Sequence, residues 1–122
     1  MYRNRFIAGV VVACLASLLF VACSAWHRAN VEANEAALSN RLDIFRTGIR
    51  KYAAERNELP QSLAALRAAG YGEASTDPIT GRDDWEVIIG EDPQIIKGKR
   101  GVINIHSSSK AISSRGTPYN TW

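Results

Sequence analysis

His106 and the three serines that follow it combine an imidazole with hydroxyl groups, the pairing that nucleophilic catalysis uses. His106 ends an alternating apolar segment that predicts a strand, and adjacent residues of a strand point to opposite faces. His106 and Ser107 are therefore poorly placed to act together as base and nucleophile. No nucleophile-elbow glycine pattern surrounds these serines. We expect a polar strand end followed by a hydrogen-bonding loop, no catalytic residue and no enzyme activity.

The densest acidic group in the sequence consists of Asp77, Asp83, Asp84 and Glu86. Calcium takes several oxygen ligands, but the alternate-residue spacing of an EF-hand loop is absent. Asp77 precedes Pro78, which favours a turn, and the two adjacent aspartates fit a solvated turn. For zinc, the chain beyond its apolar run offers only His27 and His106 and no cysteine. We therefore expect no metal site.

A third group is basic, with Lys97, Lys99 and Arg100 in a glycine-containing loop. No Walker pattern accompanies it, so we expect a solvated loop and predict no cofactor and no small-molecule substrate. The formal net charge is +3, and Arg3 and Arg5 carry two of these charges before the apolar run. The rest of the chain is close to neutral, which gives no electrostatic reason to expect nucleic acid as a partner.

The first element that positions these groups is an apolar run without a charge, from Phe6 to Trp26. As a helix it would be about 31 Å long, close to the hydrocarbon thickness of a bilayer. The positive-inside tendency places the arginine-containing start in the cytoplasm. We expect residues 1–5 to be a cytoplasmic leader, 6–26 a transmembrane helix and 27–122 an extracytoplasmic domain. A cleaved secretory signal is the alternative, but its apolar region is usually shorter, about 7–15 residues.

Cys14 and Cys23, the two cysteines of the sequence, both lie in the apolar run. The extracytoplasmic domain thus has no disulfide framework. Phe20, Val21 and Ala22 before Cys23 are compatible with a lipoprotein processing site, which makes Cys23 a candidate for lipidation. The alternative is that Cys23 is an apolar-tolerant residue of a membrane helix. Either outcome leaves the domain anchored.

Beyond the membrane the helix continues with a single apolar stripe. The spacing of three or four residues, with one of seven, is typical of one helix face. The stripe consists of Val31, Leu38, Leu42, Phe45, Ile49 and Tyr52, of which the last five form the predicted core or assembly stripe. Charged residues are expected on the other faces, namely Glu32, Glu35, Arg41, Asp43, Arg46, Arg50 and Lys51. Pro60 is expected to end this helix.

The remaining chain predicts short elements separated by turns. They are a helix over 61–69 stopped by Gly70, strands over 85–89 and 102–106, a serine-rich loop over 107–115 and a third strand over 116–122. Trp85 and Trp122 are expected to anchor a core. The predicted fold class is α+β, in which a long N-terminal helix, first membrane-spanning and then amphipathic, packs on a small antiparallel sheet.

The order of these features resembles type IV pilin-like proteins. The segment IRKYAAERNELPQSLAALRAAGY (49–71) resembles the stretch where a pilin helix ends near a tyrosine, followed by a proline and a Ser-Leu-x-x-Leu turn. The later segments resemble the C-terminal region of the major pseudopilin of the type II secretion system. They are DPITG (77–81), DDWEVI (83–88), GVINIHSSS (101–109) and GTPYNTW (116–122).

The resemblance implies a pilin-like fold and a subunit anchored in the bacterial inner membrane with its C-terminal domain in the periplasm. It also implies self-association, or association with other pilin-like subunits, by helix-to-helix stacking in a secretion or pilus-related machine. The sequence departs from the family at its leader, where Arg5 precedes Phe6 and Val10 replaces the usual glutamate. The family's calcium loop has no acidic match over 107–122, so we do not transfer calcium.

Three hypotheses follow. The leading hypothesis is a pseudopilin-like structural subunit. The second is a lipoprotein or anchored binding module with a pilin-like head that does not polymerise, which the leader and Cys23 favour. The third is a small envelope hydrolase that uses His106, and it has the least support.

Overall fold

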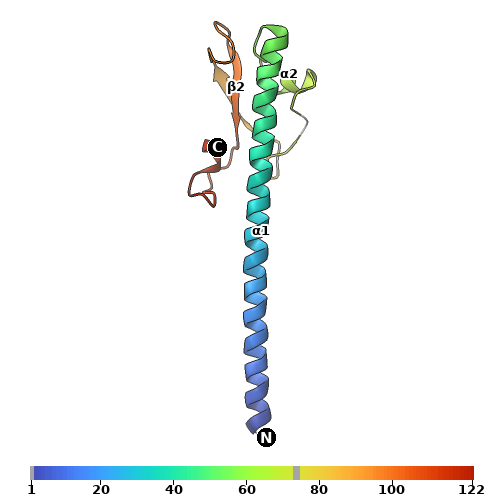
Figure 1. Cartoon of the computed structure of the whole chain (residues 1–122), viewed down its shortest axis with the longest axis vertical. Helices are drawn as coiled ribbons and strands as arrows, with labels where there is room; N and C mark the ends of the chain where they lie inside the picture. The colour runs from blue at the N-terminus through green and yellow to red at the C-terminus, as the bar shows by residue number, and fades with distance from the viewer. Residues whose placement is uncertain (1, 73–74) are drawn as a thin grey trace. The chain divides into compact units, whose positions relative to one another are not determined.

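The computed structural model describes residues 2–72 and 75–122 and contains three helices and two strands. The elements are α1 (Tyr2–Arg56), α2 (Leu63–Ala68), β1 (Glu86–Gly90), β2 (Gly101–His106) and the 3₁₀ helix η1 (Tyr119–Thr121). The chain divides into two compact units, Met1–Ala33 and Asn34–Trp122. In the second unit, α1 packs on the small sheet, with β2 alongside it (Figure 1). The predicted α+β arrangement is confirmed.

In the first unit the described residues are helical, and the apolar side chains of residues 6–26 are exposed. Phe6 and Phe20 are each 74% exposed, and Leu18 is 67% exposed. This part of α1 is long and apolar enough to cross a membrane, and none of its most apolar window is buried. Its exposed apolar surface is compatible with a lipid environment.

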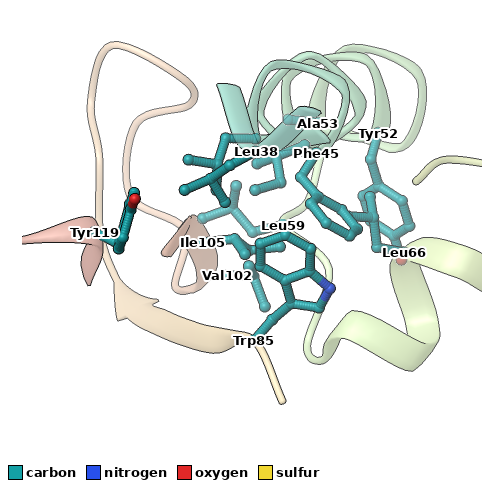
Figure 2. Close-up of a cluster of buried hydrophobic side chains, with 12 residues drawn as sticks. Leu38, Phe45, Tyr52, Ala53, Leu59, Leu66, Trp85, Val102, Ile105 and Tyr119 are labelled. Carbon is teal, nitrogen blue, oxygen red and sulfur yellow. The ribbon is translucent and has the colours of Figure 1, made fainter. Parts of the chain in front are cut away.

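In the second unit α1 contributes one buried face. The five stripe residues Leu38, Leu42, Phe45, Ile49 and Tyr52 are all buried. Phe45 meets Trp85 edge to face, with ring centroids 5.1 Å apart and an interplanar angle of 73°. Leu59, Leu66, Val102 and Ile105 complete this contact layer between the helices and β2 (Figure 2). Trp85 is thus a core residue, as predicted, whereas Trp122 is half-buried.

Helix α1 ends at Arg56, so the expectation that Pro60 ends it was wrong by three residues. Asn57 adopts a left-handed conformation with φ of 54°, and its amide donates to the Ala53 carbonyl at 2.9 Å. Asparagine tolerates this conformation because its short polar side chain bonds locally. The second helix begins at Leu63, later than predicted, because the Ser62 side chain caps it by accepting from the Ala65 amide.

Strands β1 and β2 form a two-stranded antiparallel sheet, with Val87 opposite Ile105 and an irregularity between Ile88 and Ile89. The first strand starts at Glu86, one residue later than predicted. At the start of β2, a Cβ on Gly101 would lie 2.7 Å from both Leu59 Cβ and the Pro60 carbonyl oxygen. Glycine therefore permits this close approach, which lets the Val102 amide donate to the Pro60 carbonyl at 2.8 Å.

The third strand predicted over 116–122 was wrong. Residues Tyr119–Thr121 form η1, and the nearest strand-like feature is a single bridge between Ile112 and Pro118. Pro118 lacks an amide hydrogen, and the backbone turns back on itself from Gly116, whose φ is 80°. Among the described residues the sheet therefore has two strands.

Candidate functional site

The structure separates the histidine and serine that are adjacent in the sequence. His106 Nδ1 lies 2.7 Å from the carbonyl oxygen of Trp122. The Ser107 hydroxyl donates instead to Asp77 Oδ2 at 2.5 Å. Ser107 and Asp77 are both fully buried, so this hydroxyl is closed to a substrate. The two side chains do not form a nucleophile–base pair.

Asp77 holds a turn. Its Oδ1 accepts from the Ile79 amide at 2.8 Å, and its carbonyl accepts from the Gly81 amide at 2.8 Å. Through its second oxygen it also fixes Ser107, which lies directly after β2. The predicted turn-forming role of this residue is confirmed, and the turn connects two loops that are 30 residues apart.

The neighbouring acidic residues also have individual partners. Asp83 receives two hydrogen bonds from Arg67, each 2.8 Å long, and Asp84 Oδ1 accepts from the Thr80 hydroxyl at 2.6 Å. The Arg67 hydrogen bonds are the main cause that lowers the pKa of Asp83. Among the residues that the structure describes, no group of three or more His, Cys, Asp or Glu side chains is arranged to hold a metal ion.

The basic loop and the cysteines lie at exposed positions. Lys97, Lys99 and Arg100 are exposed, and the Arg100 carbonyl accepts from Gln61 Nε2 at 2.9 Å. In the first unit Cys14 and Cys23 are free and exposed on α1. The candidate lipidation residue Cys23 is thus not engaged in the core.

The most developed polar site surrounds Glu35, which was expected on an exposed face of α1 and is in fact buried. Its Oε1 accepts from the Ser114 amide at 2.7 Å and from the Tyr119 hydroxyl at 2.9 Å. Its Oε2 accepts from the Ser114 hydroxyl at 2.5 Å. Glu35 precedes Leu38 by three residues and Leu42 by seven, so its spacing places it on the stripe. That spacing was the signal that could have identified it.

The hydrogen bonds compensate for the burial of this carboxylate. Burial by itself raises the pKa of Glu35. The hydrogen bonds from Ser114 and Tyr119 and the positive charge of Arg115 together lower this pKa by more than burial raises it. The net result is a pKa below the ordinary value of 4.5. Glu35 is therefore ionised at neutral pH and acts as an acceptor for all three donors.

A second charged side chain of α1 contacts the same end of the chain. Arg46 Nη2 donates to the Trp122 carbonyl at 2.6 Å and to the Ile105 carbonyl at 3.3 Å. Its Nε donates to Asn104 Oδ1 at 2.8 Å. Burial is the main cause that lowers the pKa of Arg46. Glu35 and Arg46 are three helical turns apart and together hold residues 107–122, which we call the tail segment.

Between these two contacts lies an open surface hollow of about 510 Å³. It is lined by α1 and tail residues, namely Ser39, Leu42, Asp43, Arg46, Arg115, Thr117, Thr121 and Trp122. Arg115 lies over the Trp122 ring, with its guanidinium carbon 4.4 Å from the ring centroid. Arg46, through its hydrogen bond to Trp122, and Arg115, over the Trp122 ring, thus join the tail segment to α1.

Comparisons with protein-family models, with curated proteins and with solved structures found no match for this chain.

Proposed function

We propose that this protein is a membrane-anchored, pseudopilin-like structural subunit of a type II secretion or type IV pilus-related machine. In this proposal residues 6–26 cross the inner membrane, the domain from residue 27 lies in the periplasm, and the protein acts by helix-to-helix assembly with copies of itself or with other pilin-like subunits.

The observation that carries the proposal is that the two parts of α1 expose and bury their apolar side chains differently. The helix begins with a segment whose apolar side chains are exposed on every side and continues with a stripe whose apolar side chains are buried. One element can thus supply both a membrane anchor and the main packing face of a small α+β head. The sequence resemblance to pilin-like proteins favours assembly as the use of this arrangement.

The polar groups support a structural role for the head. His106, Ser107 and Asp77 bond to separate structural partners, and the Ser107 hydroxyl is buried. Glu35 and Arg46 are engaged by the tail segment. These groups stabilise the fold, and the proposed activity needs no reaction from them.

The natural cysteines provide the test. Both thiols are exposed on the apolar part of α1, nine residues or about two and a half helical turns apart, and so lie on opposite sides of the helix. In native membranes, mild oxidation should produce a ladder of disulfide-linked species beyond the dimer if apolar helices stack on two sides. Cys14→Ser and Cys23→Ser should each reduce that ladder to dimers. If the oxidised protein remains a monomer at every expression level, the proposed helix-to-helix assembly is wrong.

A second candidate function is a lipoprotein or anchored binding module that does not polymerise. The exposed thiol of Cys23 after Phe20, Val21 and Ala22 favours it, as does Val10 at the position of the family's usual glutamate. Lipid attached to Cys23 would block disulfide formation there. The mass of the extracted protein distinguishes this case from simple failure to assemble.

A further inference from the structure

The tail segment, residues 107–122, is bonded mainly to itself. The Ser113 amide donates to the Thr117 carbonyl at 2.8 Å, and the Tyr119 amide donates to the Ala111 carbonyl at 3.0 Å. Further bonds join Gly116 to Ser113 and Trp122 to Tyr119. Among the described residues, each backbone-to-backbone hydrogen bond found for the tail segment has both its donor and its acceptor within that segment.

Its connections to the rest of the head are made by side chains. From α1, Glu35 holds Ser114 and Tyr119, and Arg46 holds the Trp122 carbonyl. His106 contacts the same Trp122 oxygen, and Asp77 fixes Ser107 at the start of the segment. Loss of these contacts would release the segment without breaking a β-sheet hydrogen bond.

The apolar contribution of the tail segment is also limited. Tyr119 is its one buried hydrophobic side chain among the described core residues, and it packs against Trp122 with ring centroids 5.4 Å apart. The other core residues come from α1, α2, β2 and the segments between them (Figure 2). A segment with its own hydrogen bonds and few buried side chains is typical of a unit that opens locally, below the free energy of global unfolding.

We propose that residues 107–122 form a strap that opens and closes on α1 as a unit, with Glu35 as its latch. Opening removes Tyr119 and Trp122 from the stripe side of α1. It exposes Leu42, which shares the surface hollow with Trp122 and Thr117. The strap thus determines how much apolar surface α1 presents in the head.

The charges around the latch determine its response to pH. Arg115 and Tyr119 of the strap face Glu35, and Glu32 is the charged residue one turn earlier on α1. Because the pKa of Glu35 is lowered in the folded state, its stabilisation is present at neutral pH and is lost as the pH falls through a value below 4.5. The latch is therefore closed at neutral pH, and protonation of Glu35 opens it.

Hydrogen–deuterium exchange of the full chain in detergent micelles at neutral pH tests this inference. Glu35→Ala removes the acceptor of three hydrogen bonds, and a released strap of this length does not keep its internal hydrogen bonds closed, so exchange of the bonded amides of Ser113, Ser114 and Tyr119 should rise by at least about tenfold. In the wild type and the variant alike, these amides should exchange faster than the protected amides of β1, β2 and the buried part of α1, because the strap opens without them. Glu32→Gln, on an exposed residue one turn away, is the matched control and should change neither set.

Two milder variants keep the test decisive if Glu35→Ala does not fold. Glu35→Gln retains acceptor oxygen but cannot accept on both sides, and Ser114→Ala deletes a single hydroxyl donor. Each should raise exchange of the bonded strap amides by a smaller factor, with the sheet still more protected than the strap. Equal protection of strap and sheet amides in the wild type would show that the strap has no separate opening. Unchanged exchange in the strap would show that Glu35 is not its latch.

Discussion

The two parts of α1 use the same kinds of residue in opposite environments. In the first unit Leu18 is 67% exposed and Phe20 is 74% exposed, whereas in the second unit Leu38 is fully buried and Phe45 is 1% exposed. The difference lies in the pattern. Apolar residues surround the helix in the first part and follow a stripe of three- and four-residue steps in the second.

This comparison shows what each part requires from its surroundings. A helix that is apolar on every side has no face suited to water and needs lipid or other apolar partners. A striped helix needs one partner surface, and the head supplies it through Leu59, Leu66, Trp85 and β2. A charge placed in the first part should therefore impair membrane insertion, whereas a charge placed in the second part should unfold the head.

The largest effect is expected for Ile49→Asp, because Ile49 is fully buried in the core. The substitution removes apolar contacts and buries a carboxylate without a partner, which together cost roughly 4 kcal/mol or more. That is most of the stability of a small head. Thermal unfolding in detergent, followed by tryptophan fluorescence, should show loss of the cooperative transition. A melting curve like that of the wild type would show that the stripe does not maintain the head.

Leu18→Asp should have a large effect on membrane insertion and none on the stability of the head. A charge near the centre of a membrane helix costs about 2.5–3.5 kcal/mol for insertion. Carbonate extraction should recover more of this variant in the soluble fraction, while its head unfolds at the wild-type temperature. A lowered melting temperature with normal membrane retention would contradict the division between the two parts.

Glu35→Ala should have an intermediate effect within the second part. Three hydrogen bonds to a buried carboxylate are lost, which we expect to cost about 2 kcal/mol, whereas Glu32→Ala should cost under about 0.5 kcal/mol. The wild type should also lose stability as the pH falls below 4.5, since the folded-state pKa of Glu35 is lowered. Glu35→Gln should lack this part of the acid dependence. Identical acid unfolding profiles for the wild type and Glu35→Gln would refute the assignment.

The smallest effect is expected for Asp83→Asn. The Asp83 side chain is about half exposed at 49%, so its ion pair with Arg67 should contribute under about 1 kcal/mol. The pKa of Asp83 is lowered by the Arg67 hydrogen bonds, so this contribution is present at neutral pH and is lost at acid pH below 3.8. Chemical denaturation at pH 7 and pH 3 should show a smaller difference between variant and wild type at pH 3 than at pH 7. A difference that persists undiminished at pH 3 would contradict the role of this ion pair.

Regular patterns made the main elements predictable. The long apolar run and the stripe from Leu38 to Tyr52 predicted α1, and the alternating segment at Val102 predicted β2. The end of α1 was not predictable in the same way, because a left-handed Asn57 stops the helix before Pro60 acts. Residues 116–122 were misassigned as a strand because Gly116 turns the backbone with a positive φ and Pro118 has no amide to donate, while the segment is held by Glu35, 79 residues away from Ser114.

The candidate site shows the same limit. Residue type and spacing were enough to set aside a His106–Ser107 pair and to assign Asp77 to a turn. The burial of Glu35 could not be derived from its charge, since it depends on donors that the tail brings from the far end of the sequence. Its three-residue step to Leu38 was nevertheless a usable signal, because a charged residue on an apolar stripe requires hydrogen-bonding partners.

The central claim is that the apolar part of α1 is retained as the membrane anchor of the head. Intact mass spectrometry of the protein extracted from native membranes tests it most directly. We predict a mature chain that retains residues 6–26, either with its leader or with cleavage before Phe6. A chain that begins beyond Trp26 would contradict the claim by showing a cleaved secretory signal. A diacylglyceryl-modified chain that begins at Cys23 would replace the helical anchor with a lipid and favour the lipoprotein.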